Sequence, residues 1–210
     1  MPFISFEGIE GCGKSTQARL LASALRERGL AVLLTQEPGG TEIGLRIREL
    51  VLGERGHGLS PVAELLLFFA DRAQHVEQRV RPALGEGRVV ISDRYADSSR
   101  AYQGLGRGLD PQRLEAALLL ATGGLTPELT LLIDVPVEVG LGRVRARGQS
   151  DRLESEALAF HERVRQGYLA LAAREPDRFL VLDGRRPEAE LAQAALAAAL
   201  ACLSGAPRVR

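Results

Sequence analysis

One octapeptide limits this chain to a small set of folds. Residues 8–15 read Gly-Ile-Glu-Gly-Cys-Gly-Lys-Ser, which fits the phosphate-binding pattern G-x-x-x-x-G-K-S. The only lysine of the chain is Lys14 within this segment, whereas arginine is common elsewhere. A flexible point charge reaches the β- and γ-phosphates better than a planar guanidinium does. The octapeptide therefore predicts that the chain binds a nucleoside triphosphate.

The flanking residues supply the structure that such a loop needs. Residues 3–7 alternate in the manner of a strand, and residues 14–28 carry leucines and alanines on one helical face. This arrangement directs backbone N–H groups and the positive end of the helix dipole toward a phosphate. The hydroxyl of Ser15 is the expected ligand of Mg²⁺. The residues expected around the phosphates are Gly8, Ile9, Glu10, Gly11, Cys12, Gly13, Lys14, Ser15 and Thr16.

Strand and helix patterns alternate along the whole chain. Strands are expected at 3–7, 31–35, 88–92, 129–135 and 179–182. Helices are expected at 14–28, 41–52, 61–84, 110–122, 137–146, 154–174 and 187–203. The alternation predicts an α/β P-loop NTPase fold, in which helices cover both faces of a five-stranded parallel sheet. We expect a single domain over residues 1–210.

Composition excludes several classes of protein. The chain has 210 residues, a formal net charge of zero and a sequence pI of about 6.9. This balance gives no reason to expect a nucleic-acid or membrane partner. We see no charged-then-apolar leader and no apolar run of membrane-spanning length, so a cytoplasmic protein is expected. Cys12 and Cys202 form no disulfide framework.

Charged residues follow the third predicted strand. Ligands of open α/β sheets bind beyond the carboxyl ends of the strands, which is where Asp93 and Arg94 fall. The Asp93 carboxylate is placed to hold Mg²⁺ directly or through water, and Arg94 suits a second phosphate. The alternative is a surface ion pair between these two side chains.

The predicted helix 61–84 carries an aromatic ring and a guanidinium four residues apart. Phe68 and Arg72 therefore share a helical face, where they could stack on a base and bond its carbonyl. Phe68 also has apolar neighbours, and spacing alone favours a place in the core.

Residues 142–153 form an arginine-rich segment, which we call the lid. Phosphoryl transfer needs cations on the moving group, and a mobile segment that closes over the nucleotide would bring them and exclude water. The alternative is a solvated helix face. The arginines of this segment are Arg143, Arg145, Arg147 and Arg152.

Four further motifs follow the phosphate loop, and together they resemble the thymidylate kinase family over most of the chain, from Phe6 to about Tyr168. The resemblance implies the P-loop fold of nucleoside monophosphate kinases and the reaction ATP + dTMP → ADP + dTDP, a step of dTTP synthesis. It also implies Mg²⁺ and a homodimer. The motifs are Glu-Pro-Gly-Gly-Thr at 37–41, Leu-Phe-Phe-Ala-Asp-Arg at 67–72, Asp-Arg-Tyr-Ala-Asp-Ser-Ser at 93–99 and Ala-Tyr-Gln-Gly at 101–104.

The resemblance also implies residue roles. Glu10 would accept the 3′-hydroxyl of the acceptor, and Tyr102 would lie against C2′ and select deoxyribose. Phe68 would stack on thymine, which reverses the preference for a core role, while Arg72 would bond O4 and Ser99 would lie near N3. Further substrate contacts are implied for Pro38, Arg48, Arg94 and Gln103. The implied catalytic residues are Lys14, Asp93, Arg147 and Arg152, with Arg143 at the nucleotide.

The chain departs from some members of that family at position 11. Those members carry an arginine inside the phosphate loop, whereas this chain has Gly11. The resemblance then implies that Arg147 or Arg152 of the lid supplies the transition-state charge. Glycines also follow Pro38 where some members have an arginine, which shifts the acceptor-phosphate role toward Arg48.

The sequence leaves two rival functions to consider. An enzyme of the same fold with another acceptor is the nearest, and dUMP is the hardest acceptor to exclude because one methyl group gives modest selectivity. A nucleotide switch is the rival from another class. The chain contains no asparagine, so it lacks the guanine-reading N-K-x-D motif, and it has no second lysine for a partitioning ATPase.

Overall fold

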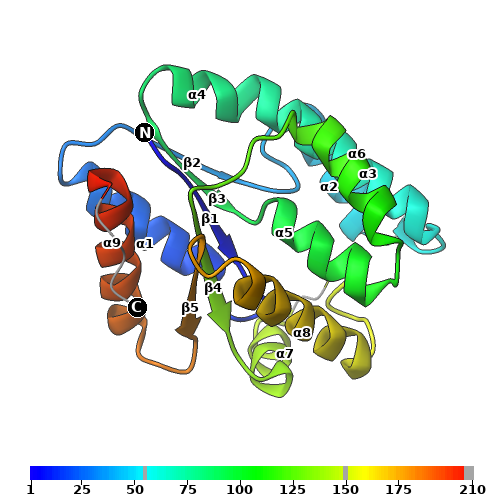
Figure 1. Ribbon diagram of the computed structural model, residues 1–210. Coiled ribbons are helices and arrows are strands. Elements are labelled where there is room, and N and C mark those ends of the chain that lie inside the picture. Colours follow the sequence, from blue (N-terminus) through cyan, green and yellow to red (C-terminus); the bar gives the residue numbers. More distant parts are fainter. Residues whose placement is uncertain (54–55, 149–150, 206–210) are drawn as a thin grey trace.

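The computed structural model describes residues 1–53, 56–148 and 151–205 (Figure 1). Its centre is a five-stranded sheet in the order β2-β3-β1-β4-β5, with every neighbouring pair parallel. The predicted fold class is therefore confirmed, and each strand lies within about a residue of its expected place. The strands are β1 (Phe3–Glu7), β2 (Val32–Gln36), β3 (Val89–Asp93), β4 (Leu129–Asp134) and β5 (Phe179–Asp183).

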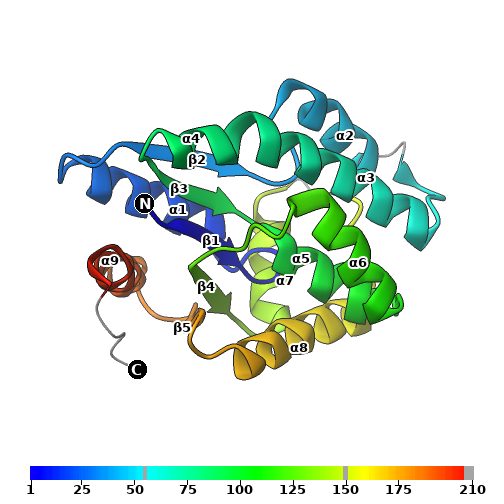
Figure 2. The ribbon, with the colours of Figure 1, turned by 45° about the horizontal axis from the view of Figure 1, so that its top comes forward.

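Helices cover both faces of the sheet (Figures 1 and 2). Helices α1 (Lys14–Arg26) and α9 (Glu188–Ser204) pack together on one face. The other helices lie on the opposite face or at the carboxyl edge of the sheet. They are α2 (Glu42–Leu52), α3 (Pro61–His75), α4 (Arg81–Gly85), α5 (Ala96–Ser99), α6 (Pro111–Thr122), α7 (Val137–Ala146) and α8 (Leu158–Arg174). Within the described segments, no helix is long and apolar enough to cross a membrane.

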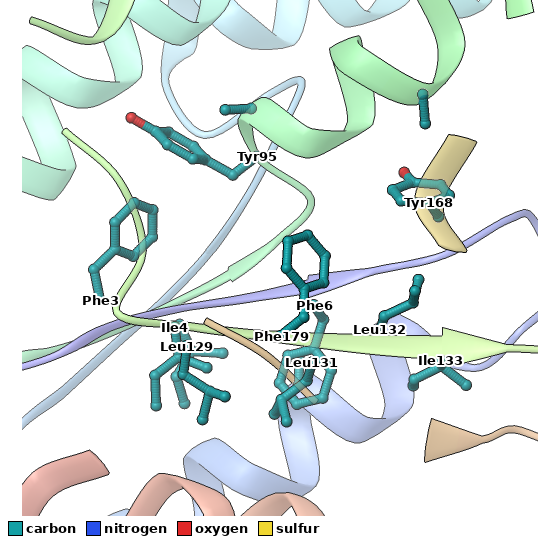
Figure 3. Close-up of a cluster of buried hydrophobic side chains, with 14 of the residues drawn as sticks. Phe3, Ile4, Phe6, Tyr95, Leu129, Leu131, Leu132, Ile133, Tyr168 and Phe179 are labelled. Carbon is teal, nitrogen blue, oxygen red and sulfur yellow. The ribbon is translucent and has the colours of Figure 1, made fainter. Parts of the chain in front are cut away.

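The core lies on both sides of the central strands. Every residue of β1 is buried, as expected for a strand covered on two faces. In Figure 3, Phe3 and Phe6 stand on the same side of the sheet as Tyr95, whereas Ile4 and Leu131 point to the opposite side. The ends of β1 and β3 lie side by side, because Phe6 pairs with Asp93. The loops that follow these strands therefore meet at one edge.

Two predicted helices differ in detail. The helix expected at 61–84 is a continuous helical run, but its turns widen to π geometry over Val76–Val80. Pro82, which has no backbone N–H to donate, follows directly in α4. The helix expected from 154 begins at Leu158, because residues before it form turns in which Asp151 Oδ1 accepts the backbone N–H of Glu154. Residues 149–150 of the expected lid lie outside the described residues.

One helical segment was not predicted. Residues Ala96–Ser99 form α5, and Arg100–Gly106 continue it with π geometry. The sequence ADSSRAYQGLG lacks a sustained 3.6-residue apolar repeat and contains two glycines, so local propensity is weak. This segment packs extensively on α8, and tertiary packing therefore accounts for it.

Candidate active site

The phosphate loop packs tightly against the end of β4 and the first turn of α7. Gly8 has φ +138°, and a Cβ built there would lie 2.4 Å from the carbonyl oxygen of Ile133. Gly11 has φ +68°, and its Cβ would lie 2.1 Å from the carbonyl oxygen of Gly140. A side chain at position 11 has no room without a backbone shift, so the loop cannot carry an arginine there in this packing.

The single lysine is turned onto its own loop. Lys14 is buried, and its Nζ donates to the carbonyl oxygen of Ile9 at 2.8 Å and lies 3.6 Å from Cys12 Sγ. These contacts place a positive charge at the mouth of the loop, where the octapeptide pattern predicts it.

Ser15 and Asp93 meet at the edge of the sheet. The Ser15 hydroxyl donates to Asp93 Oδ2, so the two predicted magnesium ligands are adjacent. Both are hard oxygen donors of the kind that Mg²⁺ takes, and the phosphates of a nucleotide would supply further donors of the same kind. The described residues contain no group of three or more His, Cys, Asp or Glu side chains that could hold a metal ion by themselves. The pair fits an ion held jointly with a nucleotide.

One cleft of about 500 Å³ collects most of the predicted site residues. It runs from the phosphate loop to helices α2 and α3 and to the segment after β3. Gly8, Ile9 and Cys12 shape the loop from behind, and Arg152 also lies outside the lining. The predicted residues that do line the cleft are Glu10, Gly11, Gly13, Lys14, Ser15, Thr16, Pro38, Arg48, Phe68, Arg72, Asp93, Arg94, Ser99, Tyr102, Gln103, Arg143 and Arg147.

At the end of the cleft away from the phosphate loop, Arg72 is held from three sides. Its side chain is only 3% exposed, and Nε donates to Glu37 Oε2 at 2.7 Å. Its other nitrogens donate to Ser99 Oγ and to the carbonyl oxygen of Tyr95, each at 3.0 Å. Phe68 lines the cleft beside it and is 9% exposed, so this ring belongs both to the core and to the cleft wall.

A histidine supports the carboxylate behind Arg72. His75 Nδ1 lies 2.7 Å from Glu37 Oε1, and His75 Nε2 lies 2.7 Å from Thr35 Oγ1. Burial raises the pKa of Glu37, but the Arg72 charge and the His75 contact together hold it below its ordinary value. An ionised carboxylate only accepts, so Nδ1 donates to it and Nε2 can accept from the threonine hydroxyl. We call Thr35, Glu37, Arg72, His75 and Ser99 the Arg72 network.

A second arginine, the half-buried Arg94, lies nearer the phosphate loop. Arg94 directly follows the end of β3. Its φ of +72° is uncommon for a residue other than glycine. It donates to Glu10 Oε1 at 3.0 Å and to the Tyr102 hydroxyl oxygen at 3.1 Å. The Tyr102 hydroxyl in turn donates to Glu10 Oε1. The surface ion pair between Asp93 and Arg94 is therefore not formed.

The same glutamate faces a histidine from α8. His161 is fully buried, and its Nδ1 lies 3.3 Å from Glu10 Oε2 without forming an aligned hydrogen bond. Burial raises the pKa of Glu10, but His161, Arg94 and Lys14 outweigh it and hold the pKa at about 2. Glu10 is therefore ionised at neutral pH. We call Glu10, Arg94, Tyr102 and His161 the Arg94 network.

A buried carboxylate at the end of β1 supports the backbone after β3. Glu7 Oε1 accepts the backbone N–H of Tyr95 at 2.8 Å, and Oε2 accepts from the hydroxyls of Ser98 and Tyr168. Burial, and then the charge of Asp97, raise the pKa of Glu7 to about 7. The Glu7 carboxylate therefore fixes the backbone of Tyr95, which directly follows Arg94.

The lid arginines have three different environments. Arg143 donates to the carbonyl oxygen of Gly11 at 3.3 Å, so it lies beside the phosphate loop as expected. Arg147 is 59% exposed and pairs with Glu154 at 2.6 Å. The prediction for Arg152 is not supported by its position: its Nε donates to the Val51 carbonyl and its Nη2 pairs with buried Glu64 at 2.6 Å.

Several functional side chains were not identified from the sequence. Glu37 lies inside a quoted motif, and His75 follows Arg72 by one helical turn, so helical spacing could have suggested their association. Glu7, Glu64 and His161 gave no such signal, because their partners lie far away in the chain.

The fold and the cleft define a class of protein. One cleft contains the phosphate loop at the end of β1, a buried aromatic ring, the buried Arg72 and the half-buried Arg94. This is the arrangement of a phosphoryl-transfer enzyme of the P-loop α/β class with a site for a phosphorylated acceptor.

Comparisons with known proteins specify the family. A sequence model described as thymidylate kinase matches residues 6–195. The chain is 51% identical over 208 residues to a thymidylate kinase of Trichlorobacter lovleyi, covering 96% of this chain and 98% of the relative. It is 54% identical over 189 residues to one from Deinococcus radiodurans, covering 90% and 91%. A crystal structure of thymidylate kinase from Ehrlichia chaffeensis superposes with a TM-score of 0.76 at 33% identity, covering 95% and 98%. The chain belongs to the thymidylate kinase family, whose members phosphorylate dTMP to dTDP.

Proposed function

We propose that this chain transfers the γ-phosphoryl group of ATP to dTMP in the presence of Mg²⁺. The observation that carries the proposal is that both arginine networks open into the cleft that begins at the phosphate loop. One end of this cleft suits a base, because Phe68 offers a ring face and Arg72 a fixed donor edge. The other end suits a sugar phosphate, because Glu10, Arg94 and Tyr102 converge there.

The acceptor requires little activation. A phosphate monoester has a second pKa near 6, so dTMP arrives largely as the dianionic nucleophile and no strong general base is needed. The protein's task is therefore alignment and charge stabilisation.

The cations of the cleft fit that task. Lys14 and Arg143 lie at the phosphate loop, and Arg147 lines the cleft from the lid side. Ser15 and Asp93 would hold Mg²⁺, which when bound neutralises charge on the phosphates. Arg152 would have to leave Glu64 before it could act on them. We therefore expect Arg147→Ala to raise the transition-state barrier by about 3–5 kcal/mol and Arg152→Ala to raise it less, as measured by kcat/KM.

An acceptor panel tests the proposed function. ADP release would be followed with ATP, Mg²⁺ and each of dTMP, dUMP, AMP, GMP, CMP, thymidine and no acceptor. We expect the highest kcat/KM with dTMP, with dUMP next because it lacks only the methyl group. Faster turnover with AMP, GMP, CMP or thymidine, or ATP hydrolysis without acceptor, would overturn the assignment.

We also propose a cytoplasmic homodimer. Helix α3 contacts both α2 and α6, and all three leave leucine, isoleucine or valine side chains exposed. Figure 2 shows these three helices together on one side of the molecule. Such a continuous apolar face suits a second copy of the chain. Light scattering after size-exclusion chromatography would give twice the mass of 22.6 kDa, and the monomer mass would contradict the proposal. The exposed side chains are Ile43, Leu45, Leu50, Val62, Leu66, Leu119 and Leu120.

A further inference from the structure

One buried carboxylate in the wall of the cleft belongs to neither network. The side chain of Asp71 on α3 lines the cleft and is only 1% exposed. Within residues 1–53, 56–148 and 151–205, it has no ion-pair partner. Burial, and then the charge of Glu37, raise its pKa to about 6. A carboxylate buried without a cation is costly, so its presence at this position calls for an explanation.

The turn after β2 supplies the hydrogen-bond partner of this carboxylate. Asp71 Oδ1 accepts the backbone N–H of Gly39 at 3.0 Å. Gly39 has φ +108°, a conformation that residues with a side chain rarely adopt. The N–H belongs to the peptide unit that joins Pro38 to Gly39. Asp71 therefore fixes one side of this peptide unit.

The other side of the same peptide unit holds Arg48. Its carbonyl oxygen, which is that of Pro38, accepts from Arg48 Nη1 at 2.8 Å. A trans peptide unit is planar and rigid, and its N–H and C=O point in opposite directions. The bond that directs the N–H toward Asp71 therefore also sets the direction from which the carbonyl oxygen meets Arg48.

Asp71 also lies against the helix that carries Arg48. Helices α2 and α3 pack side by side (Figure 2). A Cβ built on Gly44 of α2 would lie 2.2 Å from Asp71 Oδ1, so the carboxylate touches the backbone of α2 directly. Gly44 and Arg48 are four residues apart and share a face of α2. The carboxylate is thus enclosed by α2, α3 and the turn after β2.

Arg48 keeps donors for a ligand. Its half-buried side chain lines the cleft, and the bond to Pro38 uses only one of its several N–H groups. No carboxylate of the described segments pairs with it. We propose that Asp71 is a positioning residue that acts through the Pro38–Gly39 peptide unit and holds Arg48 directed at the phosphate of the acceptor. This inference rests on the proposed function, since it presupposes a nucleoside monophosphate in the cleft.

A double-mutant cycle separates positioning from folding. kcat and KM for dTMP would be measured in the wild type, Asp71→Ala, Arg48→Ala and the double variant, together with the competitive inhibition constant of thymidine. Thymidine has the base and the sugar but no phosphate, so it reports on the cleft apart from Arg48. Asp71→Asn keeps an oxygen that can accept the N–H of Gly39. Asp110→Ala is the matched control, because it removes another carboxylate that accepts a backbone N–H, away from the cleft lining.

The expected result is a loss confined to the phosphate. A hydrogen bond to a charged group corresponds to roughly 10- to 100-fold, so Arg48→Ala should raise KM for dTMP by about that factor. Asp71→Ala should raise it roughly 3- to 10-fold in the wild type and less than about twofold in Arg48→Ala. The inhibition constant of thymidine should stay within about twofold in every variant. Asp71→Asn and Asp110→Ala should behave as the wild type.

Other results would overturn the inference. An unchanged KM in Asp71→Ala, or an equal loss with and without Arg48, would mean that Asp71 does not act through Arg48. An equal rise in the inhibition constant of thymidine would mean that Asp71 supports the whole cleft. A loss in Asp71→Asn as large as that in Asp71→Ala would assign the effect to charge instead of to the bond with Gly39.

Two further arms keep the outcomes separate. If Asp71→Ala does not fold, Asp71→Ser carries the same cycle with the same expected result, because its shorter side chain withdraws the acceptor from Gly39. Arg48→Ala with the KM of the wild type would remove the role of Arg48, and with it the inference, while leaving the proposed function intact. A wild type that does not phosphorylate dTMP would remove the proposed function.

Discussion

The Arg72 and Arg94 networks are built from the same kinds of residue, but they differ in how many of their buried polar atoms are hydrogen-bonded. Each places a buried histidine behind a buried glutamate that pairs with an arginine, which is buried in the case of Arg72 and half-buried in the case of Arg94. In the Arg72 network both oxygens of Glu37 and both nitrogens of His75 are bonded. In the Arg94 network Glu10 Oε2 and both nitrogens of His161 are not. The first network is therefore fully hydrogen-bonded at the base end of the cleft, whereas the second leaves three buried polar atoms without an aligned hydrogen bond.

The difference follows from where the partners come from. Glu37 and His75 join the end of β2 to α3, two elements that also contain Thr35 and Arg72. Glu10 belongs to the phosphate loop, and its neighbours arrive from the end of β3, from the segment after α5 and from α8. The Arg94 network therefore depends on the packing of four segments, whereas Glu37, His75 and Arg72 come from α3 and the end of β2.

The largest expected effect tests whether the Arg72 network is structural. Glu37→Ala leaves the Arg72 guanidinium and His75 without their shared partner in the core. Breaking a buried pair from one side costs about 3–5 kcal/mol, so the free energy of unfolding should fall by that amount in urea titrations. A loss below about 1 kcal/mol would show that the network does not stabilise the fold.

A matched pair of substitutions compares the networks directly. His75→Phe breaks two hydrogen bonds and leaves Glu37 Oε1 and Thr35 Oγ1 unpaired, which should cost about 2–4 kcal/mol. His161→Phe removes the imidazole that lies 3.3 Å from Glu10 Oε2 but leaves the contacts of Oε1 to Arg94 and Tyr102, so the free energy of unfolding should fall by only about 0.5–1.5 kcal/mol. Thermal unfolding of both variants provides the measurement. Similar losses of unfolding free energy at the two positions would show that the two histidines contribute equally to stability, which would contradict the comparison.

The smallest expected effect concerns Glu7, whose carboxylate accepts the backbone N–H of Tyr95, the residue that follows Arg94. Its pKa is raised from 4.5 to about 7, so its contribution to stability is fully present below pH 4.5 and is lost as the pH rises through 7. Glu7→Gln should escape this loss. From pH 5 to pH 8, the variant should gain about 1–3 kcal/mol relative to the wild type, as measured by urea unfolding at both pH values.

An exposed glutamate serves as the control for that pH dependence. Glu42 pairs only with Arg46 on the surface, with both side chains at least 80% exposed. Glu42→Gln should therefore keep a constant difference from the wild type at both pH values. If Glu7→Gln behaved in the same way, the raised pKa of Glu7 would be contradicted.

Most of the fold could be predicted from the sequence because its signals are local. Apolar runs located all five strands, and the octapeptide located the loop between β1 and α1. The segment 96–106 was missed because its helical form depends on packing against α8. Arg152 was expected among the phosphates from the arginine-rich segment and the family resemblance, whereas buried Glu64 of α3 pairs with it in the structure.

The site was predicted unevenly for the same reason. Residues with a motif of their own, such as Lys14, Arg72 and Tyr102, line the cleft as expected. The side chains that support them were not identified, since His161 reaches Glu10 from a helix about 150 positions away in the chain. Sequence spacing carries no signal for such a contact, and only the folded chain brings it together.

The most direct test of the contrast between the networks is a crystal structure of the chain with dTMP bound. The account predicts that the 3′-oxygen lies within about 3.2 Å of the Glu10 carboxylate, which lines the cleft. It also predicts that the bonds among Thr35, His75, Glu37 and Arg72 are unchanged by the ligand. A 3′-hydroxyl directed away from Glu10, or an Arg72 network that rearranges on binding, would contradict the account.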